Sequence, residues 1–232
     1  MINIRRSEDR GHTNYGWLDT NYTFSFNTYY DERFMGFRAL RVINEDFIEP
    51  NRGFPTHGHK DMEIISYVVA GELAHKDSTG VSEVLRPHEV QRMTAGTGVQ
   101  HSEHSSETEK THLLQIWILP EKNNLTPDYE QKYFAPEEKL GKLRIVASRD
   151  GREGSVKINQ DVALYSSILE DGDEVSHNLE EGRHAWIQIV KGKVDLKGKT
   201  LTAGDGAAIS NEKVLPIKSL ADETEFLLFD LN

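Results

Sequence analysis

The chain has 232 residues, of which 37% are hydrophobic and 28% are charged, a composition typical of a folded protein with one large or two small domains. Its formal net charge is −11, and it contains no cysteine. An acidic surface repels phosphate backbones, which argues against nucleic-acid binding. The missing cysteines exclude disulfides and thiolate metal sites.

The N-terminal segment, MINIRRSEDRGHTNYGW, has no apolar run of the kind found in a signal peptide. No other stretch reaches the apolar length of a membrane-spanning helix. We therefore expect a cytoplasmic protein without membrane contact, and we expect it to be a monomer.

The first cluster of candidate metal ligands is His57 and His59, in the run FPTHGHKDMEI. Residues two apart on an extended strand point to the same face, so both imidazoles can face one point. A single pair of this kind is more often part of a solvated strand face than of a metal site. Residues 63–71, EIISYVVAG, follow directly and have the composition of a buried strand that ends at a glycine turn.

The second cluster, His101 and Glu103 in MTAGTGVQHSEHS, has the same spacing. Two such strands side by side would place three imidazoles and one carboxylate around one cation. Imidazole suits zinc, copper, iron and nickel, and the carboxylate oxygen shifts the preference toward iron, manganese or nickel. The two clusters together make a metal site the preferred interpretation.

Further strand-sized apolar runs occupy residues 112–120, 184–198 and 225–231, and Gly, Pro, Asn or Asp separate them. Short, closely spaced strands of this kind predict an all-β sandwich or barrel. The polar stretch 120–142 is interpreted as a connector. Within it, residues 126–134 and 135–140 have room for a turn or two of helix at most.

An internal repeat divides the chain. The run YVVAGELAHKDSTG is similar to IQIVKGKVDLKG, with Gly71 aligned with Gly192, which predicts two related β-barrels in tandem. We place the N-terminal domain at residues 1–125 and the C-terminal domain at 126–232, with the boundary between about Asn123 and Lys142.

The same alignment compares the ligand positions of the two copies. It places His57 and His59 near Asn178 and Glu180, and it places His101 and Glu103 near Ile217 and Ser219. The second copy lacks the donor set, and its nearby His177 and His184 do not have the required spacing. We therefore expect one metal ion per chain, in the N-terminal barrel.

The runs at 53–80, GFPTHGHKDMEIISYVVAGELAHKDSTG, and at 90–105, VQRMTAGTGVQHSEHS, resemble the pirin family, a branch of the cupins. The run at 185–209 is similar to the second domain of that family. The nearest resemblance is to bacterial pirin-like proteins described as quercetin 2,3-dioxygenases. It implies two jelly-roll cupin domains and one metal, held in the N-terminal domain by His57, His59, His101 and Glu103.

The resemblance also implies the identity of the metal and the chemistry. Fe(II) is the expected ion, while Cu, Ni, Mn, Co and Zn remain open. The expected reaction opens a flavonol-like, quercetin-type enolic aromatic with O2 and releases carbon monoxide, with Glu103 as the base that takes the enolic proton. The alternative function is a metal-bearing regulatory or redox-sensing protein without catalysis, and the four ligands do not distinguish the two.

The wider cupin pattern suggests one more candidate carboxylate, Glu63. On an uninterrupted strand its side chain would point to the same face as those of His57 and His59. It is interpreted either as a neighbour or substitute of Glu103 or as a charged residue at the barrel mouth. Candidate walls of a substrate pocket are the residues Phe54, Met62, Met93 and Trp117, each of which is also explained as barrel core. The extra histidines His75, His104 and His112 are assigned no role.

Overall fold

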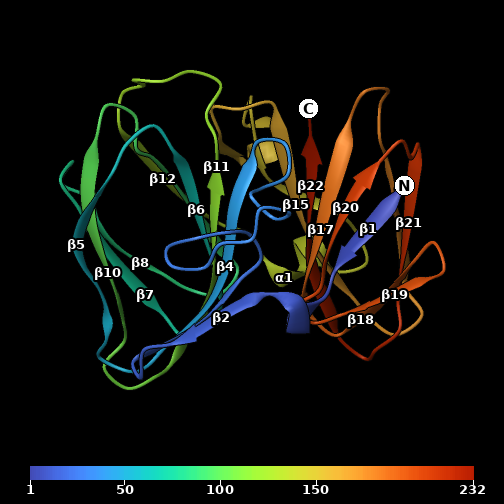
Figure 1. Ribbon diagram of the computed structural model, residues 1–232, viewed down its shortest axis with the longest axis horizontal. Coiled ribbons are helices and arrows are strands. Elements are labelled where there is room, and N and C mark those ends of the chain that lie inside the picture. Colours follow the sequence, from blue (N-terminus) through green and yellow to red (C-terminus); the bar gives the residue numbers. More distant parts are fainter. The chain divides into compact units, whose positions relative to one another are not determined.

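The computed structural model describes residues 1–232 and consists almost entirely of β-strands (Figure 1). The helices are one turn of α-helix, α1 (Pro136–Lys139), and two 3-10 turns at Ser7–Asp9 and Arg152–Gly154. None of them has the length and apolar character that crossing a membrane requires. The predicted all-β fold of two related barrels is confirmed.

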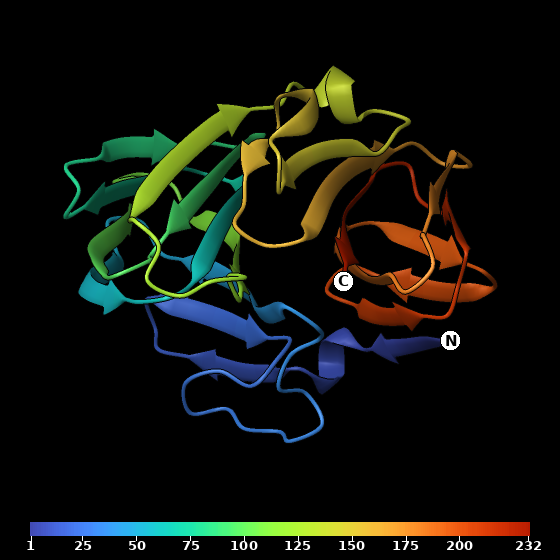
Figure 2. The same ribbon diagram turned by 90° about the horizontal axis from the view of Figure 1, so that it is seen from above.

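The strands belong to two compact units, which we call the N-terminal and C-terminal barrels. The N-terminal barrel comprises Gly11–Tyr133 and Val156–Gln160, and the C-terminal barrel comprises Met1–Arg10, Phe134–Ser155 and Asp161–Asn232. This division differs from the expected 1–125 and 126–232. Strand β1 (Ile2–Arg5) pairs antiparallel with a strand of the C-terminal barrel near the other end of the chain (Figure 2).

The N-terminal barrel is a sandwich of two antiparallel sheets. The larger sheet has the order β12-β9-β6-β11-β4-β3-β2, and the smaller has the order β5-β10-β7-β8. The bounds of these strands are β2 Gly11–Asn14, β3 Leu18–Tyr22, β4 Leu40–Ile48, β5 Gly53–His59, β6 Glu63–Ala70, β7 Leu73–Asp77, β8 Ser82–Leu85, β9 Glu89–Thr94, β10 Val99–Ser105, β11 Thr111–Ile118 and β12 Asp128–Tyr133. The segment Val156–Gln160 adds the short strand β14 (Val156–Lys157).

The C-terminal barrel repeats this arrangement. Its larger sheet contains the order β1-β20-β17-β22-β15-β13, and its smaller sheet has the order β16-β21-β18-β19. The bounds are β13 Arg144–Ser148, β15 Val162–Leu169, β16 Glu174–Asn178, β17 His184–Lys191, β18 Lys193–Leu196, β19 Lys199–Thr202, β20 Gly206–Ser210, β21 Val214–Ser219 and β22 Thr224–Leu231.

One part of the connector differs from its expectation. Residues 126–134 contain strand β12 (Asp128–Tyr133), and not a helical turn, because residues 128–133 all pair with β9. The side chain of Tyr129 lies over the ring of His75, at 5.0 Å between ring centroids, so the strand covers part of the barrel interior. The single turn α1 lies within 135–140, as expected.

The alignment of Gly71 with Gly192 is reproduced by the structure. Each glycine joins two strands at a positive φ, +73° and +79°, a conformation that disfavours residues with a Cβ. Each also lies against backbone: a Cβ would come within 2.5 Å of the Lys110 carbonyl oxygen at Gly71 and 2.3 Å of the Glu223 carbonyl oxygen at Gly192. The repeat is thus maintained by the same close approach in both barrels.

The strand registers correct the residue-level alignment of the repeat. Glu103 pairs with His75, and in the C-terminal barrel Ile217 pairs with Leu196. Since the two glycines align His75 with Leu196, Glu103 corresponds to Ile217 and not to Ser219.

The other three ligand positions shift in the same way. His101 then corresponds to Leu215, and His57, which pairs with His101, corresponds to His177, which pairs with Leu215. His59 corresponds to Leu179. The expected counterparts, among them Asn178 and Glu180, were therefore wrong by one or two residues, because a sequence alignment does not see where each strand pairs.

We expect Gly71→Ala to lower the free energy of unfolding by more than about 2 kcal/mol, since it adds a backbone clash to the cost of a positive φ. Gly80→Ala is the matched control, because Gly80 has φ +97° and no atom within 4 Å of the added Cβ. Urea unfolding of both variants measures the difference. Equal losses would show that the close approach at Gly71 contributes nothing.

Candidate metal centre

Strands β5 and β10 carry the predicted ligands next to one another. His101 pairs directly with His57, and Val99 pairs with His59. Along β10 the exposure alternates, so that His101 and Glu103 are 2% and 1% exposed while their neighbours Gln100 and His104 face solvent. The i, i+2 spacing therefore places both β10 side chains inside the barrel, as the sequence predicted.

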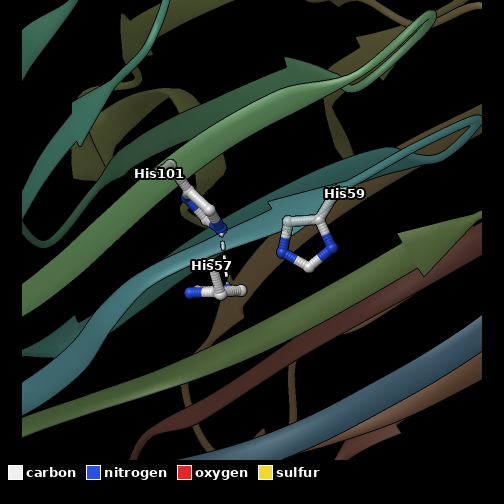
Figure 3. Close-up of side chains that lie close together, drawn as sticks. All are labelled: His57, His59 and His101. Atoms are coloured by element: carbon white, nitrogen blue, oxygen red, sulfur yellow. Dashed lines mark hydrogen bonds between the residues drawn. The ribbon is translucent and has the colours of Figure 1, made fainter.

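The three imidazoles converge (Figure 3). Ligand atoms of His57, His59 and His101 lie within 4.8 Å of one another, and Nε2 of His57 is 3.1 Å from Nε2 of His101. Two nitrogens that bind one metal at about 2.1 Å are about 3.0 Å apart at a right angle and about 3.4 Å apart at the tetrahedral angle. The spacing of these two nitrogens therefore fits a shared transition-metal ion.

The histidines also present the required lone pairs. Nδ1 of His57 is 2.8 Å from the carbonyl oxygen of Pro55, to which it donates, so Nε2 is left as the acceptor that faces the cluster. Burial lowers the pKa of His59 to about 4 and that of His101 to about 3, and neighbouring histidines add to both shifts. Both rings are neutral at pH 7, as metal ligation requires.

Glu103 lies deeper in the barrel than the three-histidine cluster. Its carboxylate accepts hydrogen bonds from Nε2 of Gln115, at 3.0 Å, and from Oγ of Ser66, at 3.4 Å. Its carboxylate belongs to a second convergent group, with His75 and His101, and does not join the first group at the same 4.8 Å limit. Burial raises the pKa of Glu103 to about 7, and the nearby Asp46 adds to this shift.

The alternative carboxylate, Glu63, points away from the cluster. Strand β5 ends at His59 and β6 begins at Glu63. Because a turn separates the two strands, counting residues from His59 does not tell which way the Glu63 side chain points. Ser66 contacts Glu103 inside the barrel, and Glu63 lies on the opposite face of β6. Its Oε2 accepts from the backbone N–H of Asn159, at 3.0 Å, and from Oγ1 of Thr94, at 3.2 Å. The interpretation of Glu63 as a neighbour or substitute of Glu103 is therefore wrong.

A cavity of about 520 Å³ opens onto the cluster within the N-terminal barrel. Of the expected wall residues, Phe54 and Trp117 line it, whereas Met62 and Met93 do not; they pack in an apolar cluster with Ile64, against which Trp117 also packs. The full lining is Tyr15, Trp17, Leu18, Thr20, Tyr22, Phe26, Asn27, Asn44, Asp46, Phe54, Pro55, His57, His59, Glu103, Gln115 and Trp117.

Sequence reasoning missed one whole wall of this cavity. Tyr15 and Trp17 lie in the turn between β2 and β3, Tyr22 ends β3, and Phe26 lies in the loop that follows. Trp17 packs edge-on against Phe54 at 5.4 Å. The signal was the aromatic density of residues 15–30, which is high for a chain with only 9% aromatic residues. The polar lining residues Asn44 and Asp46 on β4 and Gln115 on β11 gave no such signal, because nothing in their local sequence shows that they face a cavity.

The remaining histidines lie in different settings. His112 stacks on Phe47 at 4.2 Å and contacts Glu45, and His104 faces solvent. In the C-terminal barrel, Nε2 of His177 lies 2.8 Å from a carboxylate oxygen of Asp230. His75 is 2% exposed and lies directly behind His101, a position that the sequence did not predict.

Comparison with known proteins agrees with this architecture. Residues 3–118 match the pirin family, and residues 145–231 match the quercetinase C-terminal cupin domain. The chain belongs to the pirin family. It is 49% identical over 232 residues to the quercetin 2,3-dioxygenase of Escherichia coli K12, an alignment that covers 100% of this chain and 99% of the relative.

A solved structure and a second relative extend the comparison. The crystal structure of the bacterial pirin YhhW from Escherichia coli in complex with nickel(II) has a TM-score of 0.95 and 49% identity, with coverage of 100% and 99% of the two chains. A putative quercetin 2,3-dioxygenase of Pasteurella multocida is 40% identical, and the alignment covers 100% of both proteins.

We expect His59→Ala to lower the affinity for a divalent metal at least about 100-fold, since it removes one donor of the cluster. His177→Ala is the control, because His177 occupies the position of His57 in the other barrel. Metal content after dialysis and calorimetric titration with Ni(II) measure both. If the His177 variant loses its bound metal and the His59 variant keeps it, the metal site lies in the C-terminal barrel and the prediction is wrong.

Burial raises the pKa of Asp46 to about 7, and the adjacent Glu45 adds to the shift. The folded state therefore favours protonated Asp46, and this contribution to stability is lost as the pH rises from about 4 to about 7. We expect Asp46→Asn to raise the Tm of the metal-free protein by roughly 3–8 °C at pH 8, with a smaller gain at pH 5. A gain that does not change with pH would contradict this assignment.

Proposed function

We propose that this protein is a metal-dependent dioxygenase that opens a flavonol-like, enolic aromatic substrate with O2. The observation that carries the proposal is the cavity of about 520 Å³, whose aromatic walls lead to His57, His59 and Glu103. A concave, mostly apolar site with a few convergent polar groups suits a flat polyphenol. The names of the relatives from Escherichia coli and Pasteurella multocida support the same substrate class.

We further propose that His57, His59 and His101 hold the metal and that Glu103 is its fourth ligand, from the same inward face of β10. The expected ion is Fe(II), and the nickel complex of the Escherichia coli pirin supports a first-row divalent ion in this family. An ion of this type, held by these residues, would supply Lewis acidity toward a substrate oxygen and redox chemistry with O2.

Glu103 is the group proposed to take the enolic proton. Glu103 lines the cavity beside His57 and His59, so its carboxylate lies within reach of a substrate that binds there. Gln115 donates to one carboxylate oxygen and Ser66 lies near the other, so the group keeps a fixed orientation. Protonation of Glu103 would then accompany formation of the substrate anion.

The cavity walls would orient the substrate. Phe26 packs edge-on against Trp117, at 5.2 Å, and Trp117 packs edge-on against His59, at 5.0 Å, so an aromatic surface extends up to the ligands. Oδ1 of Asn44 and Nε1 of Trp117 are buried and have no hydrogen-bond partner in the protein. Buried polar atoms rarely lack a partner, so hydroxyl or carbonyl groups of a substrate would satisfy them.

The direct test is oxygen uptake by the Fe(II)-loaded protein under controlled metal content, with release of carbon monoxide as a second readout. A flavonol and the matched flavone without the 3-hydroxyl group form the substrate pair. We expect uptake with the flavonol only. Failure of every enolic compound to consume oxygen with the metal bound would contradict the dioxygenase and favour the metal-bearing regulatory protein.

We expect Glu103→Gln to retain part of the metal but to lower turnover of the flavonol by roughly 100- to 10,000-fold, since the amide cannot accept the proton. Glu63→Gln is the matched control: it changes another buried glutamate, on the opposite face of β6. Metal content and oxygen uptake are measured on the same preparation. Wild-type turnover by the metal-loaded Glu103 variant would show that another group is the base.

A further inference from the structure

A line of hydrogen-bonding groups extends from the three-histidine cluster into the barrel. Nε2 of His101 faces His57, at 3.1 Å, while Nδ1 of the same ring faces Nδ1 of His75, at 3.5 Å. Nε2 of His75 lies 3.0 Å from Oδ2 of Asp77. The order along this line is therefore Asp77, His75, His101 and then the proposed metal position.

The carboxylate of Asp77 acts only as a hydrogen-bond acceptor toward His75. Its Oδ1 receives the backbone N–H of Thr79, at 2.8 Å, the hydroxyl of Thr79, at 2.6 Å, and the backbone N–H of Val81, at 3.2 Å. Three donors on one oxygen favour the carboxylate form of Asp77. Oδ2 must then receive a proton from Nε2 of His75.

This contact determines which nitrogen of His75 carries the proton. With Nε2–H directed at Asp77, a neutral His75 has its lone pair on Nδ1. Nε2 of Gln91 lies 3.4 Å from Nδ1 of His75, so this nitrogen faces a side-chain amide as well as Nδ1 of His101.

We infer that Asp77 and His75 are positioning residues that hold His101 in the tautomer with the proton on Nδ1, so that its Nε2 lone pair is directed at the metal. His57 achieves the same result through the carbonyl of Pro55, at 2.8 Å. The imidazole of His75 takes the place of that carbonyl behind His101. This inference rests on the proposed metal site and not on the identity of the substrate.

The C-terminal barrel shows that the fold does not need these polar groups. The position of His75 is taken there by Leu196 and that of His101 by Leu215, both fully buried in an apolar core. A buried histidine with two hydrogen-bonded nitrogens replaces a leucine that packs well in the same scaffold. Its presence in the N-terminal barrel is explained by what it does to His101.

Asp77→Asn is the sharpest test, because it changes almost no volume. The amide oxygen is needed by the three donors at Thr79 and Val81, so the amide N–H is directed at His75. Nε2 of His75 must then accept, its Nδ1 must carry the proton, and His101 is left with its proton on Nε2, facing the metal position. We expect Zn(II) affinity to fall about 10- to 100-fold.

Two controls separate the tautomer from charge and stability. Asp230→Asn makes the same change in the His177 pair of the other barrel and should leave Zn(II) affinity unchanged. In a His75→Phe background, Asp77→Asn should cause no further loss, because the line is already interrupted. A loss of the same size in that background would show a through-space charge effect and would overturn the inference.

A readout that needs no variant is the long-range ¹⁵N–¹H correlation spectrum of the histidine rings in the wild-type protein, with and without Zn(II). We expect His101 with its proton on Nδ1 and His75 with its proton on Nε2 in both states. A wild-type His101 with its proton on Nε2 in the metal-free protein would overturn the inference. If the wild type binds no Zn(II), the metal site itself fails, whereas normal binding by Asp77→Asn contradicts only the role of Asp77 and His75.

Discussion

The pairing of β10 between β5 and β7 is the constraint on which the site depends. His101 lies opposite His57 on one side and Asp77 on the other, and Glu103 lies opposite His75. A slip of one residue in either pairing would turn His101 and Glu103 outward and break the cluster, since strand side chains alternate between faces. The chemistry of the site is therefore set by backbone hydrogen bonds between three strands.

The two barrels show what this constraint costs and what it provides. Where the N-terminal barrel has His75, His101 and Glu103, the C-terminal barrel has Leu196, Leu215 and Ile217, which pack in a continuous apolar core. Leucine and isoleucine contribute burial free energy at these positions, whereas a carboxylate or an imidazole needs partners to offset its lost hydration. The same scaffold thus has an apolar core at these positions in the C-terminal barrel and candidate metal ligands and their partners in the N-terminal barrel.

The parts of the site that sequence could predict are those that depend on local periodicity. The spacing of His101 and Glu103 requires only that β10 is a strand, and the glycine turns at Gly71 and Gly192 give the repeat. Glu63 was misread because a turn at 60–62 interrupts the parity, which no count of residues reveals. The role of His75 depends on the pairing of β7 with β10, and pairing between distant strands is not written in either segment alone.

The charges of the cavity support a cation at this position. Glu103 and Asp46 are both buried, burial raises the pKa of each to about 7, and the Asp46 carboxylate further opposes ionisation of Glu103. No lysine or arginine is among the residues that line the cavity, and the nearby imidazoles of His59 and His101 are neutral at pH 7. Two buried carboxyl groups without a lysine or arginine beside them destabilise the barrel when they ionise. A divalent ion held by the histidines would favour their ionised forms and convert this cost into binding free energy.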